Sequence, residues 1–462
     1  MKTKALWVKL AILAAVTLLL LVVLARIGWL VDERQQRQRE AADNVAASQA
    51  GEQMLLGPML SRWCVENWEE TQGTGKDLRV ERQRREFTLM QFPVRLNVDG
   101  ELNQETRYRS LFKVRGYAGR VALKAHFADL AGLVPVAEHK DGVLTCSDPQ
   151  MVVSVSDPRG LQAVEIRRGE EALTVVSGTT NSAYPRGLHA ALRGQALDQP
   201  LDLAVTLQLT GTTRFAVVPA ASATDVTLRS NWPHPSFGGR FLPSPATRTI
   251  DANGFSAQWT VSELATDAMT DVLKGNKQPD SLDFSMVDPV NPYVMSDRAI
   301  KYGLMFIVLT FVCVGMLELL AGRRVHPVQY LLVGLAISLF FLLLLSLSEH
   351  LSFAGSYGAA AAAVVLLLGY YGAAMLGQTS RGLGFGTLVA LLYGALYVVL
   401  IQEQAALLIG ALLLFSVLTI VMVLTRRIDW YALQGSLDAS ATRKPAAASR
   451  TSGTTPLPDW TP

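Results

Sequence analysis

Cysteine and histidine are scarce in this chain of 462 residues, which has three cysteines and six histidines. It contains no HxH, HExxH or CxxC pattern, so the usual zinc-site signatures are missing. It also lacks the GxSxG elbow of serine hydrolases and the GxxxxGK[ST] phosphate loop. We therefore expect no metal, no cofactor and no catalytic residues, although a scattered triad would be recognised only by its geometry.

Charge is also sparse and nearly balanced. Charged residues make up 18% of the chain, and 42 Lys and Arg face 39 Asp and Glu, for a net charge of +3. The run "ERQQRQRE" (33–40) alternates Arg with Gln and Glu, which is typical of a solvated helix face. The charge pattern therefore argues against a nucleic-acid partner.

Apolar residues are abundant, at 50% of the chain, and they concentrate in 6–25 and 302–424. About 20 apolar residues are enough for a helix to cross a bilayer. The first predicted span is Leu6–Ala25, with Lys9 one turn inside its start, where it can snorkel to the headgroups. It is an uncleaved anchor, because Arg26 and bulky residues stand where signal cleavage needs small ones. The five further predicted spans are 302–320, 329–348, 353–376, 383–401 and 405–424.

The loops between these spans carry an orientation signal. Their basic residues on one side are Arg323, Arg324, Arg381, Arg426 and Arg427. The alternate loops hold Glu349, His350 and Glu403 and no Lys or Arg. The positive-inside rule then places residues 1–25 (N-terminus and first span) with their start in the cytoplasm, and the tail 425–462 there too. Residues 26–300 lie outside, while the tail is Ala-, Ser-, Thr- and Pro-rich and is predicted to be disordered.

The outer region 26–300 has the pattern of a soluble domain. Residues 33–56 are predicted to form a helical lead-in, and from about residue 79 apolar and polar residues alternate. Alternation is clear in "FTLMQFPVRLNV" and "LDLAVTLQLTG", and "SLFKVRGYAGRVALKAHF" suggests a hairpin that turns at "YAG". The predicted fold is an α+β membrane protein: an anchor helix, a mostly antiparallel β-sandwich, either one large or two fused, and a bundle over 301–424.

Two of the three cysteines, Cys64 and Cys146, fall in this outer domain, where disulfides persist. The sequence leaves open whether they form a disulfide or remain separate thiols. Cys313 lies within a predicted span and is interpreted as a packing residue.

The stretch "NWPHPSFGGRFLP" (231–243) is rich in aromatic residues and proline. Pro233 and Pro235 bracket His234 and favour extended backbone there. Proline lacks the N–H that a central strand needs, so we expect a rigid crossing segment or an edge strand. Trp232 and Phe237 are expected to pack inward, and His234 is the one group that invites a test for a polar contact.

A second motif, "SDPRG" (156–160), follows a predicted strand. Asp157 before Pro158 is a typical turn former. Arg159 could bind an acidic ligand or pair with a carboxylate of its own domain, and we favour the structural role. Candidates for coupling the outer domain to the bundle are Asp297, Arg298, Lys301, Glu349 and His350, which we expect to form a polar cluster.

These motifs together resemble the CreD family of inner-membrane proteins. The segments that carry the resemblance are "ERQQRQREA" (33–41), "LGPML" (56–60), "SDPRGLQ" (156–162), "WPHPSFGGRFLP" (232–243), "HPVQYLLVGLAISLFFLLLLSLSEHLSF" (326–353) and "LTRRIDWY" (424–431). The resemblance implies the inner membrane of a Gram-negative bacterium, a periplasmic domain over 26–300 and a link to cell-envelope integrity. It implies no catalytic residues. After "LGPML" the chain departs, with "SRWCVENWEETQGTGKD" where an apolar strand is expected, which leaves the first strand of the outer domain in question.

Three hypotheses for the function follow. The first is a non-enzymatic envelope protein for integrity or stress response, whose β domain binds or senses an envelope component. Its partners would be the lipid bilayer and other envelope proteins, peptidoglycan or lipid. The alternative is a channel, flippase or transporter for a lipid or hydrophobic solute, although no span has an ionisable residue at its centre. The third is a hydrolytic enzyme that acts on an envelope substrate.

Overall fold

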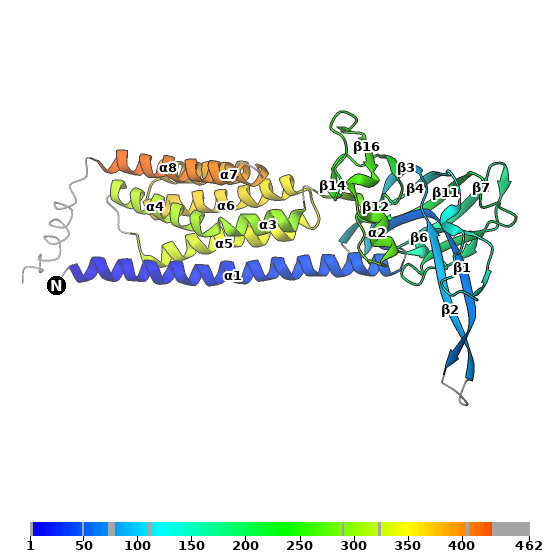
Figure 1. Ribbon diagram of the computed structural model, residues 1–462. Helices are drawn as coiled ribbons and strands as arrows, with labels where there is room; N and C mark the ends of the chain where they lie inside the picture. The colour runs from blue at the N-terminus through cyan, green and yellow to red at the C-terminus, as the bar shows by residue number, and fades with distance from the viewer. Residues whose placement is uncertain are drawn as a thin grey trace, which may run out of the picture. The chain divides into compact units, whose positions relative to one another are not determined.

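The computed structural model describes residues 3–48, 50–72, 79–109, 112–288, 291–321, 325–402 and 406–426. The chain divides into two compact units. The sheet unit comprises residues 33–291, and the helical unit comprises residues 1–32 together with 292–462. Each unit is described by itself (Figure 1).

Most of the α-helices belong to the helical unit. The helices are α1 (Thr3–Ser48), α2 (Ala268–Leu273), α3 (Pro292–Lys301), α4 (Gly303–Ala321), α5 (Pro327–Ser348), α6 (Phe353–Leu376), α7 (Thr379–Ile401) and α8 (Ala406–Thr425). The short 3-10 helices are η2 (Ala131–Leu133), η3 (Pro158–Gly160) and η4 (Glu263–Ala265).

The strands form two sheets. Their bounds are β1 (Gln53–Gln72), β2 (Arg79–Gln91), β3 (Arg95–Arg109), β4 (Phe112–Phe127), β5 (Val143–Cys146), β6 (Gln150–Val155), β7 (Leu161–Arg168), β8 (Glu171–Ala172), β9 (Val176–Ser177), β10 (Gly187–Ala191), β11 (Leu201–Thr212), β12 (Arg214–Val217), β13 (Ala223–Ser230), β14 (Pro235–Gly239), β15 (Thr249–Asp251), β16 (Gly254–Ser262) and β17 (Leu282–Met286).

The two sheets share one apolar core, as a β-sandwich does. The nine-stranded sheet has the order β14-β17-β12-β1-β6-β10-β9, with β2 and β5 also paired to β1. The eight-stranded sheet has the order β15-β16-β13-β3-β4-β11-β7-β8. Pairing is antiparallel except for β1 with β12 and β3 with β13. The alternation in "LDLAVTLQLTG" is confirmed, since every second residue of β11 from Leu201 to Leu209 is buried.

The hairpin expected at "YAG" is wrong, because β4 runs without a break through Tyr117, Ala118 and Gly119. It pairs with β3 along one edge and β11 along the other. Gly119 does not turn the chain; it lets two strands approach closely. A Cβ there would lie 1.9 Å from the carbonyl oxygen of Glu101.

The helical lead-in predicted for 33–56 is partly wrong. α1 is one helix from Thr3 to Ser48, so the first predicted span and most of the lead-in form a single element. Residues 53–56 instead begin β1, where Gln53 to Leu55 pair in parallel with β12 and Leu55 also pairs with β6. The strand is favoured over a helix there because its pairing buries Leu55 and Leu56 almost completely.

The stretch "NWPHPSFGGRFLP" contributes β14, an edge strand of the nine-stranded sheet that pairs with β17. This agrees with the edge position expected from its prolines. Gly239 ends the strand with a φ of +77°, a conformation that favours glycine.

The helical unit contains four helices long and apolar enough to cross a membrane, counting only described residues: α1 from Ala11 onward, α5, α6 and α7. α3 and α4 meet the same criterion together, across a bend of 47°. α8 contributes a shorter apolar stretch, Leu408–Val423. The five predicted C-terminal spans thus correspond to α4 through α8. Arg323, Arg324, Glu403 and Arg427, and the tail from 427 onward, lie outside the described residues.

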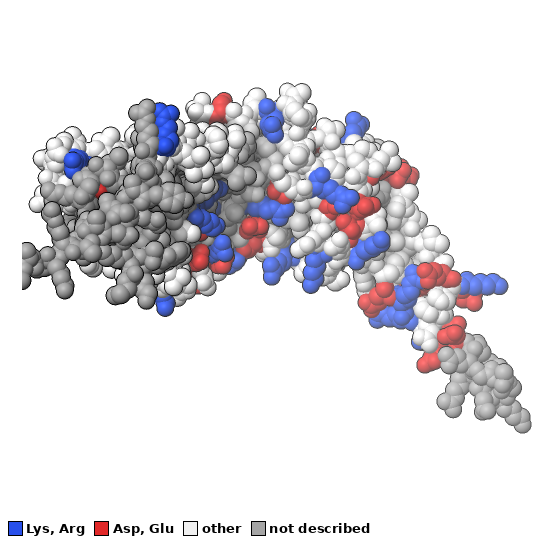
Figure 2. Space-filling view, turned by 90° about the vertical axis from the view of Figure 1, so that its left-hand side faces the viewer, with Lys and Arg blue, Asp and Glu red and all other residues white. Residues whose placement is uncertain are grey.

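Cys64 of β1 and Cys146 of β5 are joined in a disulfide. The bond fastens β5 to the base of a long arm, in which β1 and β2 pair from Leu60 with Gln91 outward (Figure 1). Charges of both signs follow this arm (Figure 2), among them the pair of Arg82 with Glu69 at 3.3 Å. The strand that departs from the family pattern is therefore a charged, disulfide-fastened arm.

The disulfide predicts a defined thiol count. Full-length protein, denatured without reductant, is expected to take up one alkyl group, at Cys313, and three after reduction. Intact-mass measurement checks this. A Cys64→Ser, Cys146→Ser variant should also unfold at lower temperature, since the bond closes a loop of 82 residues. Cys313→Ser is the control and should leave the unfolding temperature unchanged; three thiols in the unreduced protein would contradict the assignment.

Candidate functional site

The end of helix α1 is held by a dense set of hydrogen bonds from neighbouring segments of the sheet unit. The last carbonyl groups of any helix lack partners within that helix. The Arg159 side chain provides hydrogen-bond donors for two of these groups. Its Nη2 donates to the carbonyl of Ala46 at 3.2 Å, and its Nη1 donates to that of Ala47. A cation here also suits the negative end of the helix dipole.

Asp157 holds Arg159 in place for this contact. Its Oδ1 accepts from Arg159 Nε at 2.9 Å, and its Oδ2 accepts from Nη2 at 2.6 Å. The same carboxylate accepts from the backbone N–H of Gly51 at 3.0 Å and from that of Arg159 at 3.2 Å. These donors lower the pKa of the Asp157 carboxyl to about 2, chiefly through the Arg159 side chain.

The sequence "SDPRG" explains why the arginine sits there. Asp157 caps η3, Pro158 begins it, and Gly160 ends it. A Cβ on Gly160 would lie 2.3 Å from the carbonyl oxygen of Thr210 and 2.4 Å from Gln53 Nε2, so only glycine fits. The turn therefore lies directly against β11 and the start of β1.

Gln53 joins these three segments through its buried side chain. Its Nε2 donates to the carbonyl of Asp157 at 2.8 Å and to that of Thr210 at 3.2 Å. Ser156 reinforces the contact, donating to the carbonyl of Glu52 at 2.7 Å and accepting from Met54 N–H at 2.9 Å. We call this set, the end of α1 with residues 50–54, 156–160 and 210–212, the α1 junction.

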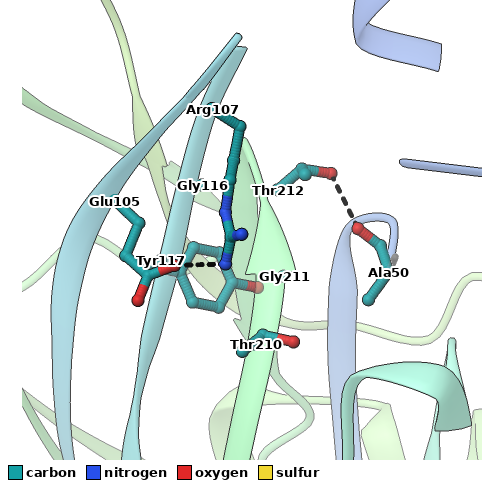
Figure 3. A pocket seen from close by; sticks show the side chains of 8 residues that line it. All are labelled: Ala50, Glu105, Arg107, Gly116, Tyr117, Thr210, Gly211 and Thr212. Carbon is teal, nitrogen blue, oxygen red and sulfur yellow. Dashed lines mark hydrogen bonds and ion pairs between the residues drawn. The ribbon is translucent and has the colours of Figure 1, made fainter. Parts of the chain in front are cut away.

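A small cavity adjoins the α1 junction (Figure 3). Its volume is about 10 Å³, room for roughly one water molecule. Thr212 donates to the carbonyl of Ala50 at 3.3 Å, and Tyr117 donates to that of Arg214 at 2.8 Å. Burial raises the pKa of Tyr117 well above its ordinary value, so the phenol stays a donor. The cavity is too small for an organic ligand, and the α1 junction fixes structure.

The contacts of Asp157 and Arg159 agree with the structural role that we favour for them, which stays a prediction. The Arg159 partners are the carboxylate of Asp157 and the end of α1. Gln53 was missed because it lay in a segment expected to be helical, although the polar residue before "MLLGPML" was visible in the sequence.

The residues of the "NWPHPSFGGRFLP" stretch serve the core of the sheet unit. Trp232 is buried, and its Nε1 donates to the carbonyl of His234 at 2.8 Å. Phe237 is half-buried and packs edge-on against Phe255 and Trp259. The ring of His234 is exposed, while Pro233 and Pro235 are half-buried. Their position supports packing, and a recognition role for them stays a prediction.

The five predicted coupling residues lie in the helical unit on two elements. Lys301 pairs with Asp297 at 2.7 Å along α3, whose Arg298 is half-buried. At the end of α5, Glu349 accepts from Tyr293 of α3 at 3.4 Å, and His350 is exposed. The two elements therefore meet through Tyr293 and Glu349.

Lys9 makes a second charged contact in the helical unit. Its Nζ lies 2.5 Å from Glu318 Oε1. Tyr330 donates to the other Glu318 oxygen at 2.9 Å. Both side chains are only partly exposed, which strengthens the attraction between their charges. The sequence alone is consistent with this contact, since Lys9 lies near the start of the span 6–25 and Glu318 near the end of the span 302–320, on the side predicted to be cytoplasmic.

The shifted pKa of Asp157 gives a pH-dependent prediction. The ionised carboxylate stabilises the folded state above about pH 4, the ordinary pKa of Asp, and that contribution is lost as the pH falls through about 2. An Asp157→Asn variant should therefore melt a few degrees below the parent at neutral pH, with a gap that closes below about pH 4. Thermal unfolding of the full-length protein in detergent measures this. Asp99→Asn, in an exposed pair with Arg229, is the control and should differ little from the parent; a gap that is constant with pH would contradict the account.

Comparison with known proteins covers nearly the entire chain. The family model described as "Inner membrane protein CreD" matches residues 5–431. The chain is also 34% identical over 438 residues to the inner membrane protein CreD of Escherichia coli (strain K12), which covers 94% of this chain and 95% of that protein. Both matches extend across the sheet unit and the helical unit. The chain therefore belongs to the CreD family.

Proposed function

We propose that the protein is a non-enzymatic inner-membrane protein that contributes to envelope integrity, with a periplasmic β domain that binds or senses an envelope component. The observation that carries this proposal is the α1 junction. An apolar helix long enough to span a membrane continues into the sheet unit, and its last turn is fastened there by Arg159. A sheet domain fastened in this way suits a membrane-attached binding protein.

The disulfide supports the periplasmic location. Disulfides persist in the periplasm and are rare in the cytoplasm. Cys64 and Cys146 both lie in the sheet unit, and their bond fixes β5 to β1. Placing this unit in the periplasm agrees with the basic loop residue Arg381 on the cytoplasmic side. The printed name of the relative, an inner membrane protein, supports the choice of membrane.

One observation favours a binding role over transport. In the helical unit, α5, α6 and α7 pack around an aromatic cluster in which Tyr357 donates to the carbonyl of Tyr393 at 2.6 Å. Close aromatic packing suits an anchor or relay better than a pathway for a solute.

The proposed orientation predicts a labelling pattern. In a Cys313→Ser background, Leu264→Cys in the sheet unit should react with a membrane-impermeant maleimide in intact spheroplasts. Gln378→Cys, in the connection between α6 and α7, should react only after permeabilisation. Both positions are exposed, so reactivity reports the side of the membrane. The reverse pattern would overturn the proposed orientation.

We also propose that Asp297, Arg298, Lys301, Glu349 and His350 couple the β domain to the helical bundle. Replacing all five by Ala should weaken envelope integrity, measured as survival in detergent, because it removes the Glu349 carboxylate that accepts from Tyr293 of α3, together with the Asp297–Lys301 pair on α3. Membrane insertion, measured by carbonate extraction, should stay unchanged.

A control for this variant carries Ala at Glu69, Arg82, Arg84 and Glu86, which form exposed pairs on the β1–β2 arm. It should survive like the parent. Parental survival of the five-residue variant would refute the coupling role and would leave the proposed orientation untouched.

A further inference from the structure

The outer face of the eight-stranded sheet carries a hollow of about 380 Å³ that the α1 junction does not include. That volume falls within the range of small-molecule sites. Side chains of Arg95, Asn97, Lys124, His126, Asp202 and Ala204 line it. Their strand neighbours on the opposite face, such as Leu96, Leu123 and Leu203, are buried in the core. The lining side chains therefore point away from the core.

Strand register arranges these side chains in two rows. Arg95 of β3, His126 of β4 and Asp202 of β11 lie directly opposite one another. Two residues along each strand, Asn97, Lys124 and Ala204 form the next row. Directly opposed side chains are about 5 Å apart, and diagonal ones about 7–8 Å, so Arg95 and Lys124 can contact the same small group.

A small residue beside long ones creates the hollow. Ala204 stands between Lys124 and Arg167 across the strands. Its methyl group leaves a low floor, and Gly169 in the turn between β7 and β8 lines the hollow too. The shape thus follows from side-chain size on a regular sheet.

Two other cations on the same face form ion pairs. Arg229 pairs with Asp99 at 2.5 Å, and Arg167 pairs with Glu165 at 2.6 Å. Among the described residues, by contrast, neither Arg95 nor Lys124 has an ion-pair partner. Two unpaired cations within reach of one another are suited to a carboxylate or phosphate group.

The other end of the hollow presents acceptors. His126 Nδ1 lies 2.8 Å from Asp202 Oδ1. This contact leaves Nε2 of His126 available to a ligand hydroxyl group, which can donate or accept. Asp202, which is largely exposed, has further lone pairs. This end therefore suits the hydroxyl groups of a ligand and disfavours a second anion.

We propose that this hollow, the anionic-sugar site, binds a saccharide that carries a carboxylate. The anion lies between Arg95 and Lys124, and hydroxyl groups hydrogen-bond with His126 Nε2 and donate to Asp202. Asn97 can donate or accept beside the anion. This inference rests on the proposed function, because an envelope saccharide reaches the site only if the sheet unit faces the periplasm.

The test uses full-length protein in an uncharged detergent and two matched sugars. N-acetylmuramic acid differs from N-acetylglucosamine by a lactyl group that carries a carboxylate. Inorganic phosphate is the second control, because it supplies an anion without a sugar. Titration followed by ligand-observed NMR should show the acid bound at least about tenfold more tightly than the neutral sugar and than phosphate. Equal affinity for the two sugars would overturn the proposal, and so would absence of binding.

Variants separate the site from the general charge of the sheet face. Arg95→Gln with Lys124→Gln should weaken binding of N-acetylmuramic acid about tenfold or more. The matched control, Arg120→Gln with Arg229→Gln, removes the same charge from the same face outside the hollow. It should retain parental affinity, and an equal loss in both variants would refute a specific site.

A third variant tests the shape. Ala204→Tyr fills the floor without changing charge, and aromatic residues are well tolerated in strands. It should abolish binding while leaving the thermal midpoint near that of the parent; parental affinity would refute the hollow as the site. Failure of these tests would leave the maleimide labelling unaffected, so the site and the proposed orientation fail separately.

Discussion

The start of the sheet unit depends on hydrogen-bond donors for the last carbonyl groups of α1. A helix that ended against a sheet without partners for its last carbonyls would leave strong acceptors without donors, at a cost comparable to lost hydrogen bonds. Arg159 provides the donors, and Asp157 neutralises and orients it. Because Asp157 also accepts from Gly51, the same group sets where the chain leaves the helix. β1 can then begin at Gln53 in the register that buries Leu55.

Other charges near the core follow the same rule of local compensation. Asp283, which is 3% exposed, accepts from Arg214 at 2.6 Å across β12 and β17. Glu66, which is fully buried, accepts from the backbone N–H of His139 at 2.9 Å through Oε1, and its Oε2 lies 3.8 Å from Arg85 Nη1. Breaking such contacts costs much more than breaking exposed pairs, which contribute little.

Patterns in the sequence predicted the features that depend only on neighbouring residues. The alternation of β11, the turn at Asp157 and the edge position of the stretch around Pro235 are all properties of a few neighbouring residues. Contacts distant in sequence were not predictable in this way. The partners of Arg159 lie 112 and 113 residues away, and the disulfide joins residues 82 apart. Gly119 was misjudged because glycine serves both turns and close strand contacts, and only its neighbours distinguish the two.

The regular sheet explains how a binding surface can arise without a conspicuous sequence motif. Side chains on one face of paired strands stand in fixed rows, so residues from β3, β4 and β11 converge although they are far apart in the sequence. Rigid strands lose little entropy when a ligand binds, which favours affinity from few contacts. Arg95, Lys124 and His126 each look like ordinary solvated residues in their own strand. They come together only through the register of the strands. Core-facing residues such as Leu96 and Leu123 fix that register, because a slip of one residue would turn these apolar side chains to solvent.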